Sequence, residues 1–137
     1  MNISSEQVLV TKPAKEVFDF LTDFNNYEKL MPEQVIRWES DKDSGRFTIK
    51  DLTEIGMRIE SFEAYRFVQL HSDGKVPFEF TLTFHLDENA EGNTLVHADF
   101  EGQVGGMIAM MAKRPLTNLV NHMVEQIQHQ LPATSNQ

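Results

Sequence analysis

The middle of the chain alternates between hydrophobic and polar residues with a period of two. In the clearest run, from Phe78 to Leu86, every second side chain is apolar and the side chains between are polar. This alternation is typical of a strand that packs one face on a core and turns the other to water. Similar runs recur across residues 34–104, and short turn-forming stretches rich in glycine, asparagine and aspartate separate them. We therefore predict an antiparallel sheet that buries one face.

The inward face of one strand is ambiguous. In the segment 65–72, Val68 and Leu70 compete with Tyr65 and Phe67 for the buried positions. Because successive residues of a strand point to opposite faces, only one of these pairs can face the core. We expect Val68 and Leu70 to point inward.

Helical periodicity appears on both sides of this region. Near the start, Pro13 precedes apolar residues at Val17, Leu21 and Phe24, whose spacing predicts one face of a short helix. Asp23 is placed to cap a second short helix directly after the first.

A long helix is expected over residues 107–131. Its second part carries a broad apolar stripe from Leu116 to Leu131. Pro115 should kink or restart the helix, because proline lacks the N–H group that a helix interior uses.

Together these elements predict a strand over residues 2–11, two short helices, about six further strands and the long helix. A single sheet of about seven antiparallel strands is too long to stay flat, so it should curl. The terminal helix carries the stripe that is large enough to fill the resulting hollow. We predict an α+β fold in which the sheet grips that helix, with one domain at 1–131 and a disordered tail at 132–137.

Composition and charge exclude several classes of protein. The chain has 137 residues and a formal net charge of −9, and it contains no cysteine. Disulfides, thiolate metal sites and cysteine nucleophiles are therefore excluded. The acidic charge disfavours nucleic acid and anionic membranes as partners. Residues 1–10 show no targeting signal and no apolar run is long enough to span a membrane, so we expect a cytoplasmic protein without membrane insertion.

Two segments carry a resemblance to a known group of proteins. The stretch from Lys12 to Asp23 and the stretch from Tyr27 to Pro32, within this order of elements, resemble the SRPBCC superfamily. That superfamily includes START lipid-transfer domains, the birch-pollen allergen and polyketide cyclases. The runs Leu30–Gln34, Phe47–Lys50 and Lys113–Asn118 look more narrowly like a small bacterial branch without a described function. The resemblance implies a helix-grip fold with a hydrophobic cavity between sheet and terminal helix, and it supplies no catalytic residue.

Large apolar side chains are the candidate ligand contacts. Aromatic and aliphatic walls usually line pockets for apolar molecules, and methionine adapts to irregular shapes. The alternative is that these side chains simply fill the core and leave no ligand-sized cavity. The candidate ligand-binding residues are Trp38, Phe47, Met57, Phe78, Phe80, Phe84, Phe100, Met107, Met110, Met111, Leu119 and Met123.

One part of the terminal helix could act as a gate. Three methionines at 107–111 lie between the flexible pair Gly105-Gly106 and Pro115. We predict that an apolar ligand enters beside residues 105–111. The alternative is that the glycines only turn the chain and the proline only fits the helix to a curved sheet.

Histidines provide the remaining candidate chemistry. If both apolar faces of the hairpin point inward, His85 lies opposite His97, with Asp87 and Asp99 diagonal to them. Such a set could hold zinc, but it faces water, where polar strand residues need no special explanation. We predict no metal site, no cofactor and no catalytic residue.

The most consistent function is the binding or carrying of a small hydrophobic ligand, such as a lipid, isoprenoid or polyketide-like compound, by a monomer or homodimer. One alternative is an enzyme of the polyketide cyclase or dehydratase kind, which would need inward acid–base groups. The other is a protein-interaction module whose cavity is vestigial.

Overall fold

The computed structural model describes residues 1–131, so the predicted tail at 132–137 lies outside the described residues. Its elements follow the predicted order of strand, two short helices, strands and long helix. They are β1 (Asn2–Ser4), β2 (Val8–Val10), α1 (Ala14–Leu21), the 3₁₀ helix η1 (Phe24–Leu30), β3 (Val35–Ser40), β4 (Ser44–Ile49), β5 (Thr53–Glu63), β6 (Phe67–Ser72), β7 (Phe80–Glu88), β8 (Thr94–Gly102) and α2 (Gly106–Gln130).

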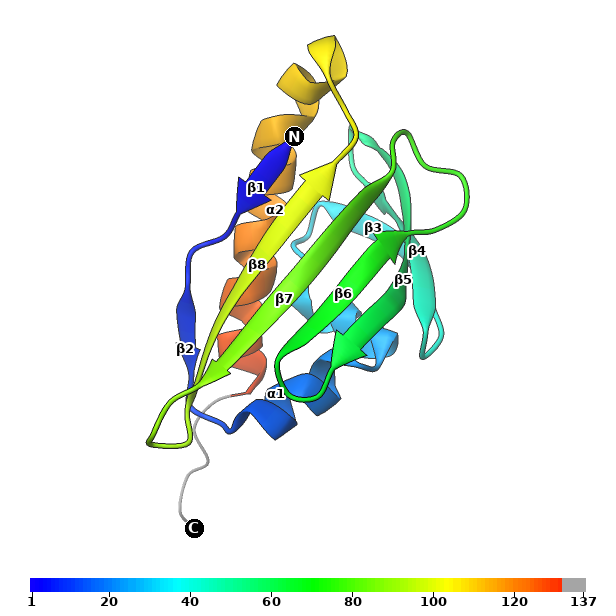
Figure 1. Ribbon diagram of the computed structural model, residues 1–137. Coiled ribbons are helices and arrows are strands. Elements are labelled where there is room, and N and C mark those ends of the chain that lie inside the picture. The colour runs from blue at the N-terminus through cyan, green and yellow to red at the C-terminus, as the bar shows by residue number, and fades with distance from the viewer. Residues whose placement is uncertain (132–137) are drawn as a thin grey trace.

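All strand pairs are antiparallel, and they form one sheet in the order β1-β8-β7-β6-β5-β4-β3, with β2 also paired to β8. The sheet curls, and α2 runs along its concave side (Figure 1). The predicted α+β helix-grip fold is therefore confirmed. Among the described residues, no helix has both the length and the apolarity needed to cross a membrane.

The predicted first strand is divided in two, which raises the number of strands to eight. The division occurs at Ser5, whose backbone N–H donates to the Ala98 carbonyl. The Ser5 hydroxyl accepts a hydrogen bond of 2.8 Å from the Ala98 N–H. A side chain thus replaces one backbone partner of β8, and the ladder is interrupted there.

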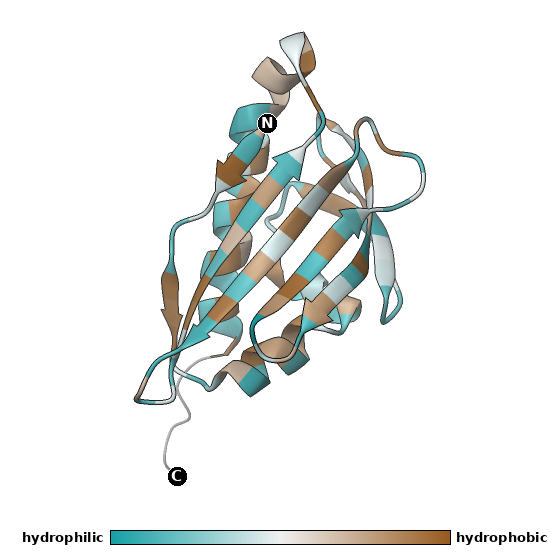
Figure 2. Cartoon of the chain, viewed as in Figure 1, coloured by the Kyte–Doolittle hydropathy of each residue, from teal (hydrophilic) through white to brown (hydrophobic). Residues whose placement is uncertain are grey.

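The predicted alternation holds along the central strands. Val68 and Leu70 of β6 are fully buried, which confirms the favoured face. On β7, Phe80, Leu82 and Phe84 are buried, while the polar residues between them are half-exposed. Figure 2 shows the same alternation as bands of opposite hydropathy along β6 and β7.

The edge strand β3 departs from the predicted pattern. Its register shifts between Ile36 and Glu39, and Arg37 within this bulge has a positive φ of 56°. The bulge interrupts the alternation expected across residues 34–104, and Ile36 turns outward, where it is 37% exposed.

The terminal helix α2 is one continuous helix with Pro115 inside it, so the predicted restart does not occur. Proline removes a single backbone hydrogen bond, and the turns on both sides continue around it. Its buried side chains face the sheet: Ala112, Leu116, Leu119, Val120, Met123, Val124 and Ile127. The first turns of α2 project beyond the end of the sheet (Figure 1).

Helices α1 and η1 close the opposite end of the concave side. Asp23 caps η1 as predicted, because its carboxylate accepts from the Asn25 N–H at 3.0 Å. The Tyr27 ring stacks on Phe24 at 4.8 Å, and its hydroxyl donates to the Leu21 carbonyl at 2.9 Å. Complete burial raises the pKa of Tyr27 well above its ordinary value.

Candidate ligand-binding cleft

A small apolar void lies between the sheet and α2, toward the end that α1 and η1 leave open. Its volume is about 20 Å³, close to that of a single water molecule. The lining side chains are all apolar, so the void is expected to be dry. They are Ile49, Ile55, Met57, Phe78, Phe80, Leu82, Phe100, Leu116, Leu119 and Val120.

A larger apolar opening adjoins this void at the first turns of α2. Its volume is about 240 Å³. The void and the opening share Ile55, Phe78 and Leu116, so these side chains separate the interior from the opening. The remaining lining residues are Leu52, Thr53, Pro77, Ile108, Met111 and Ala112.

A second groove of about 490 Å³ lies on the other side of α2. It shares Ile49 and Leu119 with the void, but its walls are mixed in polarity and include Lys50, Arg114 and His122. The opening at the first turns of α2 therefore gives the more apolar route to the interior.

Five of the predicted ligand residues surround the void: Met57, Phe78, Phe80, Phe100 and Leu119. The rings of Phe80 and Phe100 stack at 5.3 Å, and Phe78 meets each of them edge-on. These phenylalanines occupy most of the space. Of the two alternatives drawn from the sequence, the described structure shows the filled interior.

Four other predicted residues lie deeper or to one side. Trp38 and Phe47 stack at 5.2 Å, and Trp38 also stacks on Phe24 of η1. Phe84 and Met123 are fully buried, and Phe84 meets Tyr27 edge-on at 5.9 Å. All four belong to the packing that joins the sheet and α2 to η1.

The predicted gate methionines are the most exposed of the large hydrophobic side chains among residues 1–131. Met107, Met110 and Met111 are 74%, 81% and 67% exposed. Met111 lines the opening, and Met110 borders a shallow hollow beside Lys113 and Arg114. Gly106, at the start of this segment, has a positive φ of 61°, a conformation that glycine adopts without strain.

The ligand prediction passed over several lining residues of the void: Ile49, Ile55, Leu82, Leu116 and Val120. All five occupy the inward positions of the alternating or helical patterns. The periodicity that predicts the core therefore also predicts that these five side chains face the interior. The ligand prediction missed them because it favoured aromatic residues and methionines.

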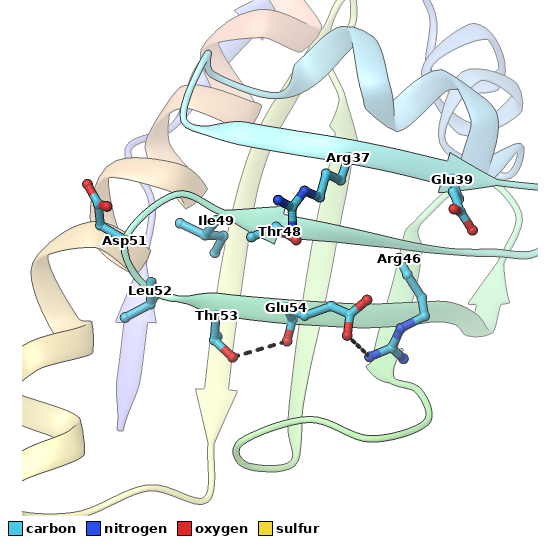
Figure 3. A pocket seen from close by; sticks show the side chains of 9 residues that line it. All are labelled: Arg37, Glu39, Arg46, Thr48, Ile49, Asp51, Leu52, Thr53 and Glu54. Carbon is cyan, nitrogen blue, oxygen red and sulfur yellow. Dashed lines mark hydrogen bonds and ion pairs between the residues drawn. The ribbon is translucent and has the colours of Figure 1, made fainter.

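A polar hollow of about 520 Å³ lies on β3, β4 and β5, with Arg37, Arg46 and Glu54 across it (Figure 3). Arg46 donates to the carbonyls of Asp73 and Lys75 at 3.0 and 2.7 Å, and it pairs with Glu54 at 3.5 Å. Its guanidinium therefore anchors the loop between β6 and β7.

Acid–base groups do not line the void. Ser72 and Thr94 are the buried polar residues of the described chain. The Thr94 hydroxyl donates to the Lys12 carbonyl at 2.7 Å, and the Ser72 hydroxyl accepts from the Phe80 N–H at 3.2 Å. Both hydroxyls thus serve the backbone.

Solved structures with the same fold cover nearly the whole chain. A protein from Thermus thermophilus is 10% identical, with a TM-score of 0.72 over 96% of this chain and 97% of that chain. A START superfamily protein from Mycobacterium smegmatis is 13% identical, with a TM-score of 0.67 over 95% of this chain and 96% of that chain.

The di-domain ARO/CYC BexL from the BE-7585A biosynthetic pathway is 16% identical, with a TM-score of 0.66 over 94% of this chain and 45% of that chain. At these identities the likeness concerns the fold alone. The sequence matches no protein-family model, and no curated protein matches it.

Proposed function

We propose that this protein binds and carries a small apolar molecule between the sheet and α2, in the cytoplasm and without catalysing a reaction on it. A lipid, an isoprenoid or a polyketide-like compound has the required chemistry. The observation that carries the proposal is the apolar path from the exposed Met111 to the interior void, interrupted only by side chains such as Phe78 and Leu116. Burial of apolar surface, at about 25 cal/mol per Å², would drive binding.

Ligand entry requires a part of the cleft to move. Pockets for small molecules measure roughly 300–1,000 Å³. The void of about 20 Å³ and the opening of about 240 Å³ fall below that range. The segment 106–111 is the natural moving part, because its large apolar side chains are exposed and Gly105 and Gly106 lie at its start.

The lining of the void favours carriage over catalysis. A cyclase or dehydratase needs at least one acid or base within hydrogen-bonding reach of its substrate. The described walls of the void offer only hydrocarbon and thioether groups. Two neighbours of the same fold, a START superfamily protein and an ARO/CYC protein, are compatible with either use of such a cleft.

Titration with three probes tests the proposal: decanoic acid, geraniol and a hydroxylated naphthalene, each followed by native mass spectrometry and by NMR shifts. We expect at least one probe to bind in a one-to-one complex that shifts Met57, Phe100 and Leu119. Failure of all three to bind, or shifts confined to residues far from the void, would contradict the proposal.

A matched pair of variants locates the binding. Leu116 separates the void from the opening, whereas Leu86 is a similarly buried leucine that lines neither. Leu116→Ala should join the two spaces and strengthen probe binding, and Leu86→Ala should destabilise the fold without that gain. Equal binding by both variants would show that the probe binds elsewhere.

A further inference from the structure

Two histidines and an aspartate converge on the outer face of the sheet, opposite the cleft. His85 of β7 and His97 of β8 are direct cross-strand partners, as the sequence register predicted. Their rings stack with centroids 4.7 Å apart and planes 15° apart. Both Nε2 atoms approach the same oxygen, Asp99 Oδ2, at 3.1 Å from His85 and 3.7 Å from His97.

We propose that His85, His97 and Asp99 bind a divalent transition-metal ion, with Zn²⁺ as the best match. Imidazole nitrogen and carboxylate oxygen are ligands that Zn²⁺ accepts at about 2.0–2.2 Å in tetrahedral geometry. Tetrahedral bonds of that length place neighbouring ligand atoms about 3.3–3.6 Å apart. The two nitrogen-to-oxygen distances bracket this spacing. Because the imidazole planes lie only 15° apart, ion entry requires the rings to rotate until both Nε2 lone pairs point at the ion.

The three candidate ligand atoms form a compact group. All lie within 4.8 Å of one another, and within residues 1–131 no other group of three such side chains does so. The side chains are 36–42% exposed, which leaves room for water to complete the coordination. The net charge of −9 favours a cation over an anion at this face.

The surroundings hold the carboxylate in place. Asp99 Oδ1 accepts a hydrogen bond of 2.7 Å from the hydroxyl of Ser4, which β1 places directly opposite Asp99. Its other oxygen is thereby left to face the histidines. Such outer partners orient metal ligands, and their loss typically weakens metal affinity about 10–100-fold.

The site differs from an ordinary polar strand surface in this convergence. The alternating pattern shows that the three residues share a face, but it does not show that two ring nitrogens meet at one oxygen. The three side chains also lie on rigid paired strands, which hold ligand groups more accurately than loops do.

The test uses the full chain without a histidine tag, freed of metal by a chelator and titrated with Zn²⁺ in a calorimeter. We expect one ion per chain. His85→Gln and His97→Gln should each abolish this binding, and Ser4→Ala should weaken it about 10-fold because the Asp99 carboxylate loses its anchor. Co²⁺ as a substitute should give visible absorption bands typical of low coordination number.

His71→Gln is the matched control, because His71 lies half-exposed on the neighbouring strand β6 and points its Nδ1 to the Ser72 carbonyl. This variant should bind Zn²⁺ like the unmodified chain. Circular dichroism verifies that every variant is folded. Absence of binding by the unmodified chain, or unchanged binding after either substitution at His85 or His97, would overturn the proposal.

Discussion

The two ends of the cleft between the sheet and α2 differ in how far they bury their apolar side chains. At the end covered by η1, Tyr27, Phe84 and Met123 are completely buried. At the other end, Met107 and Met110 of the same helix are mostly exposed. Apolar residues at the closed end therefore contribute fully to the stability of the fold, whereas the exposed methionines at the open end contribute little to it. This difference leaves the open end available to a ligand.

The largest expected contrast is between two phenylalanines. Phe84→Ala should reduce the free energy of unfolding by about 3–5 kcal/mol, because removing a fully buried ring leaves a cavity. Phe78→Ala at the open end should cost only about 1–2 kcal/mol, because a half-buried ring gives up less apolar area. Urea unfolding of both variants measures the difference. Equal costs would mean that the two ends contribute alike to the fold.

The stability costs of truncating Met123 and Met110 compare the two ends of the cleft along α2. Met123→Ala should cost about 2–5 kcal/mol, the usual range for truncating a buried methionine. Met110→Ala should change stability by no more than about 0.5 kcal/mol, since its side chain is 81% exposed. Thermal and urea unfolding report both values. A costly Met110→Ala would show that residues 106–111 are packed after all.

A smaller effect concerns the hydroxyl of Tyr27. Tyr27→Phe should cost about 1–2 kcal/mol at neutral pH, because the buried Leu21 carbonyl loses its donor.

The pKa of Tyr27 is raised in the folded chain, so the folded state keeps the phenol proton at pH values where the unfolded state loses it. This stability is complete below the ordinary pKa of 10.0 and is lost as the pH rises above it. Tyr27→Phe should therefore weaken the alkaline loss of stability, and unfolding curves on both sides of that pH detect the change. An alkaline slope identical to that of the unmodified chain would contradict this assignment.

Periodicity predicted the parts of the fold that depend on alternation. The inward face of β6 and the pairing of His85 with His97 both followed from the rule that apolar residues share one face. The order of elements and the gripping of α2 followed in the same way, because only that helix carries a large enough stripe.

Features that depend on individual hydrogen bonds or rotamers could not be predicted. The break at Ser5 needs one hydroxyl to replace a backbone partner, and the bulge at Arg37 needs one residue with positive φ. The size of the void depends on how Phe78, Phe80 and Phe100 pack together. A sequence pattern shows that these rings share an interior, but it does not show how much space they leave.

Amide hydrogen exchange along α2 tests the difference between the two ends most directly. The first amides of any helix lack acceptors, so the informative region is 110–112 compared with 117–128. We expect faster exchange at 110–112, and slower exchange there once a bound apolar probe such as decanoic acid covers the opening. Uniform protection across 110–128, or exchange that no apolar probe alters, would contradict a ligand entrance at this end of the cleft.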